Sequence, residues 1–243
     1  MKIIPVLDIL NGMVVHAVRG ERKEYRPLKS ALCASANPVD LARAFKSFEF
    51  DDLYVADLDA ILGKPENLAI YKQIKAETGL NLMVDAGINN IEKAERVLGT
   101  GTSYIIIGTE TLNDLDFIRQ AVKSLGKDRV IVSIDLKGGK VLSRSENVKS
   151  KSPLLLAEKM EKMGVAKIII LDLARVGAEQ GVNLAIIREV LEKTKVEILA
   201  GGGIRGIKDL EELRSMGVSA ALVATVLHTG KVTAEELKSK SFI

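Results

Sequence analysis

Two aspartates end apolar runs of the sequence in a way that packing does not require. Asp8 follows the run Ile3–Leu7, and Asp135 follows the run Val130–Ile134. A buried carboxylate without a partner is costly, so such a residue at the end of a buried strand needs another reason to be there. Two carboxylates at facing strand ends can give and take a proton, which is general acid–base catalysis. The alternative is that each one holds a loop or pairs with Lys137, Lys140 or Arg205.

A glycine run near the end of the chain could bind an anion. Gly201, Gly202 and Gly203 follow an apolar run and open a helical pattern, which lets the backbone approach a ligand closely with its N–H groups free. Ala224 and Thr225 end the next apolar run and add N–H groups and a hydroxyl. Glycines also make ordinary turns, but phosphate groups commonly bind between strands seven and eight of a βα barrel. We therefore expect a phosphate site here.

The first half of the chain carries a weaker version of the same pattern. Asp85 and Ala86 stand where the second half has glycines, and Asp85 would repel a phosphate. Whether this half binds phosphate stays open, with three retained residues as its candidates: Gly87, Gly108 and Thr109. We expect secondary roles in orienting loops or supporting the site for three residues that follow strands two and six: Asp57, Asp172 and Arg175.

The elements that must position these residues alternate regularly. Short apolar runs, each followed by an amphipathic helical pattern, lie at residues 3–7, 53–56, 80–84, 104–107, 130–134, 167–171, 196–200 and 220–224. Asn37-Pro38 and Ser152-Pro153 each place a capping side chain before a proline at a helix start. Eight such units in 243 residues predict an α/β fold, a closed (βα)₈ TIM barrel in one domain. A doubly wound open sheet is the alternative.

The second half of the sequence repeats the first. The same number of positions separates Asn67 from Asn183, Gly87 from Gly203, and Thr109 from Thr225. The Asp8 and Asp135 strands also match, with a larger separation that places extra residues in the first βα loop. We therefore expect two duplicated (βα)₄ half-barrels, at about residues 1–123 and 124–243.

Composition narrows the function classes. The net charge is only +3 and no basic block stands out, so a nucleic-acid partner is not expected. His16, His228 and the single Cys33 show no metal-ligand spacing, and no disulfide can form. The chain has no apolar run of about 18 residues and does not open like a signal peptide, so we expect a cytoplasmic protein without membrane contact.

Together, these motifs resemble those of the histidine-biosynthesis βα barrels. That family contains the phosphoribosylformimino-aminoimidazole carboxamide ribotide isomerase and the cyclase subunit of imidazole glycerol phosphate synthase. The resemblance covers essentially the whole chain, and its most specific parts are the Asp8 strand with Asn11–Val15, the Asp135 strand with Gly138–Val141, Gly108-Thr109, and Gly201–Arg205.

The resemblance implies a duplicated half-barrel with two phosphate sites and a phosphorylated small-molecule substrate. In the isomerase, the aspartates of strands one and five, here Asp8 and Asp135, would transfer protons in an Amadori rearrangement of an aminoaldose to an aminoketose. The resemblance implies neither a metal nor an organic cofactor. The cyclase works with a glutamine-amidotransferase subunit, which leaves such a partner open for this chain.

The chain departs from the isomerase pattern after strand six. That pattern resembles Thr-Asp-x-x-x-Asp-Gly-Thr, but Leu171, Val176 and Ala178 replace its Thr, its second Asp and its final Thr. We therefore expect a divergent phosphosugar-type isomerase. One alternative is a lyase or condensing enzyme that acts on a monophosphate in cofactor biosynthesis, with Arg19, Arg22 and Arg26 of the long first loop meeting an anionic group. Another is a non-catalytic subunit that binds a phosphorylated ligand.

Overall fold

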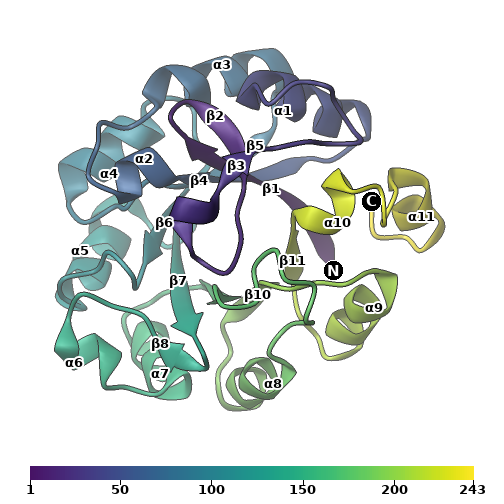
Figure 1. The fold of residues 1–243 in the computed structure, drawn as a ribbon. Helices are drawn as coiled ribbons and strands as arrows, with labels where there is room; N and C mark the ends of the chain where they lie inside the picture. Colours follow the sequence, from purple (N-terminus) through teal and green to yellow (C-terminus); the bar gives the residue numbers. More distant parts are fainter.

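The computed structural model describes all residues, 1–243, and shows a closed barrel of eight parallel strands (Figure 1). The last strand pairs with the first, with Lys2 beside Ala220 and Pro5 beside Val223. This closure leaves no free sheet edge among the barrel strands. Around the ring the strands are β1 (Lys2–Leu10), β4 (Asp52–Asp57), β5 (Asn81–Asp85), β6 (Tyr104–Gly108), β7 (Val130–Lys137), β9 (Lys167–Asp172), β10 (Glu197–Gly201) and β11 (Ala220–Val223). The predicted (βα)₈ barrel is therefore confirmed.

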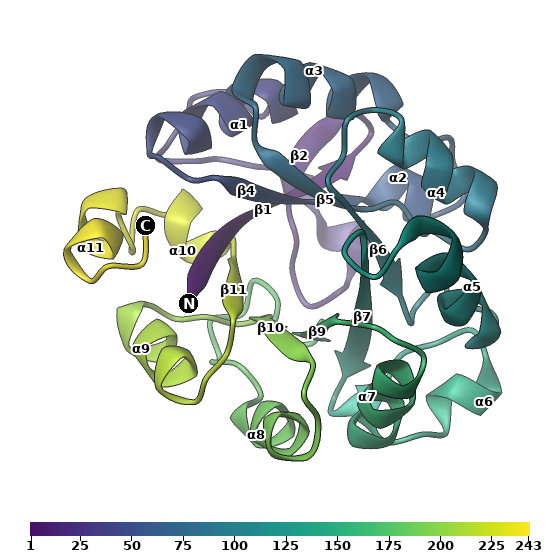
Figure 2. The ribbon, with the colours of Figure 1, turned by 180° about the vertical axis from the view of Figure 1, so that it is seen from behind.

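Helices surround this barrel, as the two opposite views show (Figures 1 and 2). The longer ones are α1 (Pro38–Ser47), α3 (Leu68–Thr78), α4 (Ile91–Leu98), α5 (Asp116–Leu125), α7 (Pro153–Lys162), α8 (Leu184–Lys193), α9 (Ile207–Ser215) and α11 (Ala234–Ser239). Short helices sit in the loops: η1 (Arg22–Glu24), α2 (Leu58–Ile61), α6 (Glu146–Lys149) and α10 (Thr225–His228). None of these helices has the length and apolar character that a membrane span requires.

Two of the predicted helix starts are confirmed in atomic detail. The Asn37 side chain accepts hydrogen bonds from the N–H groups of Val39 and Asp40, and Pro38 occupies the first helical position of α1. Ser152 caps α7 in the same way by accepting from Leu155. Such caps typically contribute about 1 kcal/mol each, because they satisfy N–H groups that have no partner within the helix.

The core has two layers, one inside the barrel and one outside it. The inner cluster takes buried residues from every barrel strand, among them Ile4, Tyr54, Ile131 and Leu222. The larger outer cluster lies between the strands and the helices. Successive side chains of a strand point to opposite faces, so each strand serves both layers. This explains why the strands are continuously apolar rather than alternating.

Two tight hairpins extend the strands that carry the aspartates. β1 turns at Asn11-Gly12 into β2 (Met13–His16), and β7 turns at Gly138-Gly139 into β8 (Lys140–Val141). All four turn residues have φ between 52° and 75°, the left-handed conformation that a type I′ hairpin turn needs and that Asn and Gly tolerate. The β2 strand then pairs with β3 (Arg26–Pro27). The duplication of the half-barrels stays a prediction.

Candidate active site

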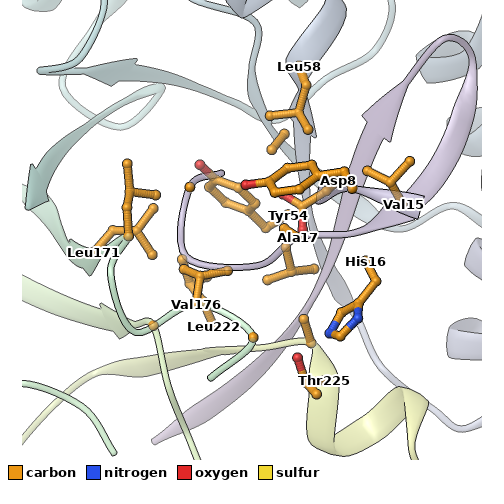
Figure 3. A pocket seen from close by; sticks show the side chains of 18 of the residues that line it. Asp8, Val15, His16, Ala17, Tyr54, Leu58, Leu171, Val176, Leu222 and Thr225 are labelled. Carbon is orange, nitrogen blue, oxygen red and sulfur yellow. The ribbon is translucent and has the colours of Figure 1, made fainter. Parts of the chain in front are cut away.

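A cavity of about 280 Å³ opens at the C-terminal ends of the barrel strands. Its lining combines carboxylates with an apolar wall, and Figure 3 shows Asp8 and Tyr54 close together on one side with Leu171, Val176 and Leu222 farther along. The long first βα loop, residues 11–36, contributes His16, Arg22 and Tyr25 to this lining. We call residues 11–36 the lid, because they lie in front of the barrel in Figure 1 and behind it in Figure 2.

The two aspartates singled out by the sequence both line this cavity. Asp8 is on β1 and Asp135 is on β7, and three strands separate β1 from β7 in either direction around the ring. They therefore approach the cavity from opposite sides. Burial raises the pKa of Asp8 to about 7, and the charge of Arg22 only partly opposes this. Burial and the nearby Asp85 raise the pKa of Asp135 to about 7 as well.

The environments of these two carboxyl groups differ. Asp135 is held firmly: its carboxylate accepts from the Ser133 hydroxyl at 2.7 Å and from the Glu110 N–H at 3.0 Å, and its own N–H donates to the Thr109 hydroxyl. No such hydrogen bond lowers the pKa of Asp8, which leaves its oxygens free for a ligand. A carboxyl group with a pKa near neutrality can either donate or accept a proton at physiological pH.

Two further carboxylates complete an acidic half of the mouth, formed by Asp8, Asp85, Glu110 and Asp135, which all line the cavity. The strand register places Asp8 beside Ala56 and Ala56 beside Asp85, so only a methyl side chain separates the two aspartates. Burial raises the pKa of Asp85 to about 6. The pKa of the buried Tyr54 hydroxyl is raised well above its usual value by burial and by Asp85 and Asp135.

The opposite half of the mouth is mainly apolar, although Thr225, His228 and Glu179, which pairs with Lys231, also line it. Asp135 is beside Leu171 in the register, and Leu171 is beside Gly201. Gly201 does not line the cavity, because it is packed between Leu171 and Leu222. Leu171 and Val176, which replace polar residues of the isomerase pattern, do line it, as do Leu142, Leu173 and Leu222. We call this the apolar half.

The apolar half contains the backbone groups that the sequence suggested for anion binding. Gly202, Gly203, Ala224 and Thr225 line the cavity, and the N–H groups of Gly202, Gly203 and Thr225 donate no hydrogen bond within the chain. Gly202 and Gly203 have φ of +91° and +92°, and a Cβ atom would approach the carbonyl oxygens of Asp172 and Gly181 to 2.5 and 2.7 Å. These positions therefore require glycine. Free N–H groups of this kind suit a phosphate.

The corresponding residues of the first half lie outside the cavity lining. Gly87 is buried, and its N–H donates to the Asp85 carboxylate at 2.9 Å. Thr109 is fully buried, its N–H donates to the Ser133 carbonyl oxygen, and its hydroxyl accepts from Asp135. Gly108 leaves room for two carboxylates: a Cβ there would lie 2.9 Å from an Asp135 oxygen and 3.3 Å from an Asp85 oxygen. Asp85 and Asp135 thus fill the space beside Gly108, and the N–H groups of Gly87 and Thr109 are engaged within the protein.

The residues with expected secondary roles hold loops. Asp57 is fully buried, caps α2 through Ala60, and accepts from Asn67 and from the Tyr71 hydroxyl. Asp172 accepts from the Ala174 N–H and pairs with Arg175 at 3.2 Å. Arg175 also donates to the carbonyl oxygen of Gly181 at 2.9 Å, next to the glycine loop. None of Asp57, Asp172 and Arg175 lines the cavity.

The lid is fastened to both halves of the mouth. Arg22 donates to both oxygens of Glu110 at 2.7 Å, and Lys137 pairs with Glu21 at 2.9 Å. On the other side the Arg19 N–H donates to the Val176 carbonyl oxygen, and Ser30 meets the His228 ring at 3.0 Å.

The close approach of the lid depends on Gly177. Gly177 has φ of +67°, and a Cβ at this position would overlap the carbonyl oxygen of Ala17 in the lid. The lid can therefore lie against this loop only because residue 177 has no side chain.

Sequence reasoning missed several of the lining residues. Glu110 belongs to no recognised motif, although it directly follows Gly108-Thr109 at the end of β6. Tyr54 reads as an ordinary core residue, and only its place in the register reveals that it faces the cavity. His16 lines the cavity near Thr225 (Figure 3), and its Nε2 atom is buried without a hydrogen-bond partner. Burial lowers the pKa of His228 to about 4. No cluster of three or more His, Cys, Asp or Glu side chains is placed to hold a metal ion.

Comparison of the sequence with known proteins identifies the family of this chain. The family model described as "Histidine biosynthesis protein" matches residues 2–233. An uncharacterized protein of Methanocaldococcus jannaschii is 37% identical to this chain over 99% of both sequences. Proteins named as phosphoribosyl imidazole-4-carboxamide isomerases from Methanosphaera stadtmanae and Streptococcus thermophilus are 31% and 32% identical, over 97% and 98% of this chain and 98% and 99% of their own lengths. The chain therefore belongs to the histidine-biosynthesis protein family.

Proposed function

We propose that this protein is an isomerase of the ribotide-isomerase type that acts on a phosphorylated, sugar-like small molecule. One observation carries the proposal: two carboxyl groups on opposite strands, Asp8 and Asp135, line one cavity, and burial brings the pKa of each to about 7. The isomerase relatives at 31–32% identity over nearly the full length support the same reaction class.

The reaction we propose is an Amadori-type conversion of an aminoaldose to an aminoketose. One carboxyl group donates a proton to the ring oxygen, so the ring opens to an iminium ion. The other, as a carboxylate, removes the proton from the neighbouring carbon and leaves an enolamine. Reprotonation and tautomerisation then give the aminoketose, so no proton is gained or lost overall. Such general acid–base steps typically contribute about 10²- to 10⁴-fold to a rate.

Binding of the phosphate would fall to the apolar half. The free N–H groups of Gly202, Gly203 and Thr225 converge on the cavity, while Leu171 and Leu222 exclude water around them. Exclusion of water strengthens the attraction between such N–H groups and an anion. The reacting carbon of the ligand would then lie between the two aspartates.

A lyase or condensing enzyme that acts on a monophosphate is the second candidate. The position of Asp85 favours it, because this carboxylate accepts the Gly87 N–H that a first-half phosphate would need. The acid–base pair would serve this reaction too.

The test is turnover of the histidine-pathway aminoaldose bisphosphate, and of single-phosphate aminoaldoses, followed by NMR. We expect conversion of at least one of them by the unaltered protein and a loss of about 10²-fold or more in Asp8→Asn. Asp52→Asn is the matched control, because Asp52 is a buried strand carboxylate that pairs with Lys2 at the start of β4, away from the cavity. Conversion that Asp8→Asn leaves unchanged would refute the proposal.

A further inference from the structure

We infer that the ligand of this cavity is a monophosphate whose other end carries a protonated amine, and that the amine lies against the carboxylates of Asp85 and Asp135. This inference rests on the proposed function for its phosphate end. It adds the chemical class of the opposite end, which the isomerase resemblance would make a second phosphate.

The cavity has glycine-loop donors for one phosphate. Among the matched glycine-loop residues of the two halves of the sequence, Gly202, Gly203 and Thr225 line the cavity and keep their backbone N–H groups free. Their counterparts, Gly87 and Thr109, donate to groups of the protein and do not line the cavity. A second phosphate would therefore find no free glycine-loop N–H groups in the acidic half.

The acidic half carries more carboxyl groups than nearby cations. The acidic half presents four carboxyl groups, and the one cation that lies against it from the lid, Arg22, is bound to both oxygens of Glu110. Lys137 also lines the cavity, but it pairs with Glu21, on the lid. Asp8, Asp85 and Asp135 therefore line the cavity without a salt bridge of their own, and the charges of Arg22 and, for Asp85, of Lys93 only partly oppose the rise of the pKa of Asp8 and Asp85 that burial causes. A phosphate would be repelled here, whereas a cation would be attracted.

The arrangement of Asp85 and Asp135 suits an ammonium group better than a metal ion. Oxygens of Asp85 and Asp135 lie within 3.3 and 2.9 Å of the point that a Gly108 Cβ would occupy, so these two cavity-lining carboxylates are close to each other. The carboxylates are nevertheless not arranged as a metal-binding cluster. An ammonium group, with three donors on one nitrogen, suits oxygens that come from different strands.

The same geometry predicts that binding releases protons. Burial raises the pKa of Asp85 to about 6 and of Asp135 to about 7. An adjacent ammonium would lower both values, because an opposite charge favours the ionised form. Binding of the amine should therefore strengthen as the pH rises from 6 to 8, by linkage.

The test uses three probes that share one linker: aminopentyl phosphate, hydroxypentyl phosphate and pentane bisphosphate, each with its groups at opposite ends. Calorimetry at pH 8 should show the amine binding about tenfold more tightly than the alcohol, as one charge-assisted hydrogen bond would provide. The bisphosphate should bind most weakly. At pH 6 the preference for the amine should shrink; the phosphate itself titrates equally in both probes and cancels in their ratio.

Asp85→Asn should bring the amine-to-alcohol affinity ratio close to one and leave the affinity for the alcohol unchanged, whereas Asp52→Asn should preserve the ratio. Equal affinities of the unaltered protein for amine and alcohol, or tightest binding of the bisphosphate, would overturn the inference without any variant. If hydroxypentyl phosphate binds as tightly as aminopentyl phosphate, the phosphate site of the proposed function stands and only the inferred amine site is refuted. If no probe binds, the phosphate site of the proposed function fails and the inference fails with it.

Discussion

The two halves of the barrel mouth differ in chemistry, although the ends of β5 and β6 in one match the ends of β10 and β11 in the other by sequence pattern. The acidic half lies around β1, β5, β6 and β7 and gathers Asp8, Asp85, Glu110 and Asp135. The apolar half lies around β9, β10 and β11. It contains leucine side chains and the free backbone N–H groups of Gly202, Gly203 and Thr225. The difference turns on a few substitutions, above all Asp85 at the end of β5, where the other half has glycine. Matched motifs thus need not keep matched ligands once one carboxylate occupies the anion site.

The largest effect is expected from the acidic half. Replacing Asp135 with Asn should lower kcat about 10²- to 10⁴-fold, because the amide can neither give nor take the proton. The affinity for a phosphate monoester should change little, because that group is expected in the apolar half. Steady-state kinetics and calorimetry on one preparation would check both, and a large loss of phosphate affinity with intact kcat would reverse the assignment of the two halves.

A matched pair of glycine substitutions probes the two halves directly. Gly203→Ala should reduce phosphate affinity by about tenfold or more and destabilise the fold by about 1–3 kcal/mol, since φ is +92° and the Cβ would lie 2.7 Å from the Gly181 carbonyl oxygen. Gly87→Ala places a Cβ 3.1 Å from Ile61 at φ +64° and should also destabilise. Only Gly203→Ala should weaken phosphate binding. Equal loss in both variants would mean that the first half binds phosphate too.

The acidic half should also make stability depend on pH. The pKa of Asp135 rises from 3.8 to about 7 on folding, so between these values the folded protein keeps a proton that the unfolded chain has lost. The free energy of unfolding therefore falls as pH rises through this window. Urea denaturation at pH 5 and pH 8 should show a smaller fall in Asp135→Asn than in the unaltered protein, by on the order of 2 kcal/mol. An equal or larger fall in the variant would contradict the assignment.

The smallest effects concern the two ion pairs between the lid and the acidic half. Arg22→Ala should raise KM severalfold and lower the free energy of unfolding by about 1–2 kcal/mol, because it leaves the Glu110 carboxylate unpaired. The side chains of Arg22 and Glu110 are both less than one-third exposed, so solvent screens this pair only partly. Lys137→Ala breaks the pair with Glu21, whose side chains are 52% and 60% exposed, and should cost at most about 0.5 kcal/mol. Thermal denaturation and KM measurements on both variants would check this order.

Sequence reasoning reached the fold and part of the site, for identifiable physical reasons. The barrel follows from a long-range periodicity of apolar runs, and the helix caps at Asn37 and Ser152 follow from local chemistry. Asp8 and Asp135 were recognisable because a carboxylate at the end of an apolar strand is conspicuous. Tyr54 and Glu110 were not, because their roles depend on the register and on contacts between strands that lie far apart in the chain.

The candidate phosphate residues show the same limit. Gly87, Gly108 and Gly201 have the right residue type, but they are packed away from the cavity. A glycine that exposes its N–H group and a glycine that only makes room for a neighbour look identical in sequence. The Asp85 side chain, which accepts the Gly87 N–H, distinguishes them only once the turn is folded.

The glycine at 177 gives an experimental handle on the lid. Because a single methyl group there would overlap the Ala17 carbonyl oxygen, Gly177→Ala should hold the lid ajar without altering Asp8, Asp135 or the glycine-loop N–H groups. Comparing this variant with the unaltered protein would distinguish the rates of ligand entry and release from the rate of the chemical step. One added carbon atom would thus widen the entrance to the cavity.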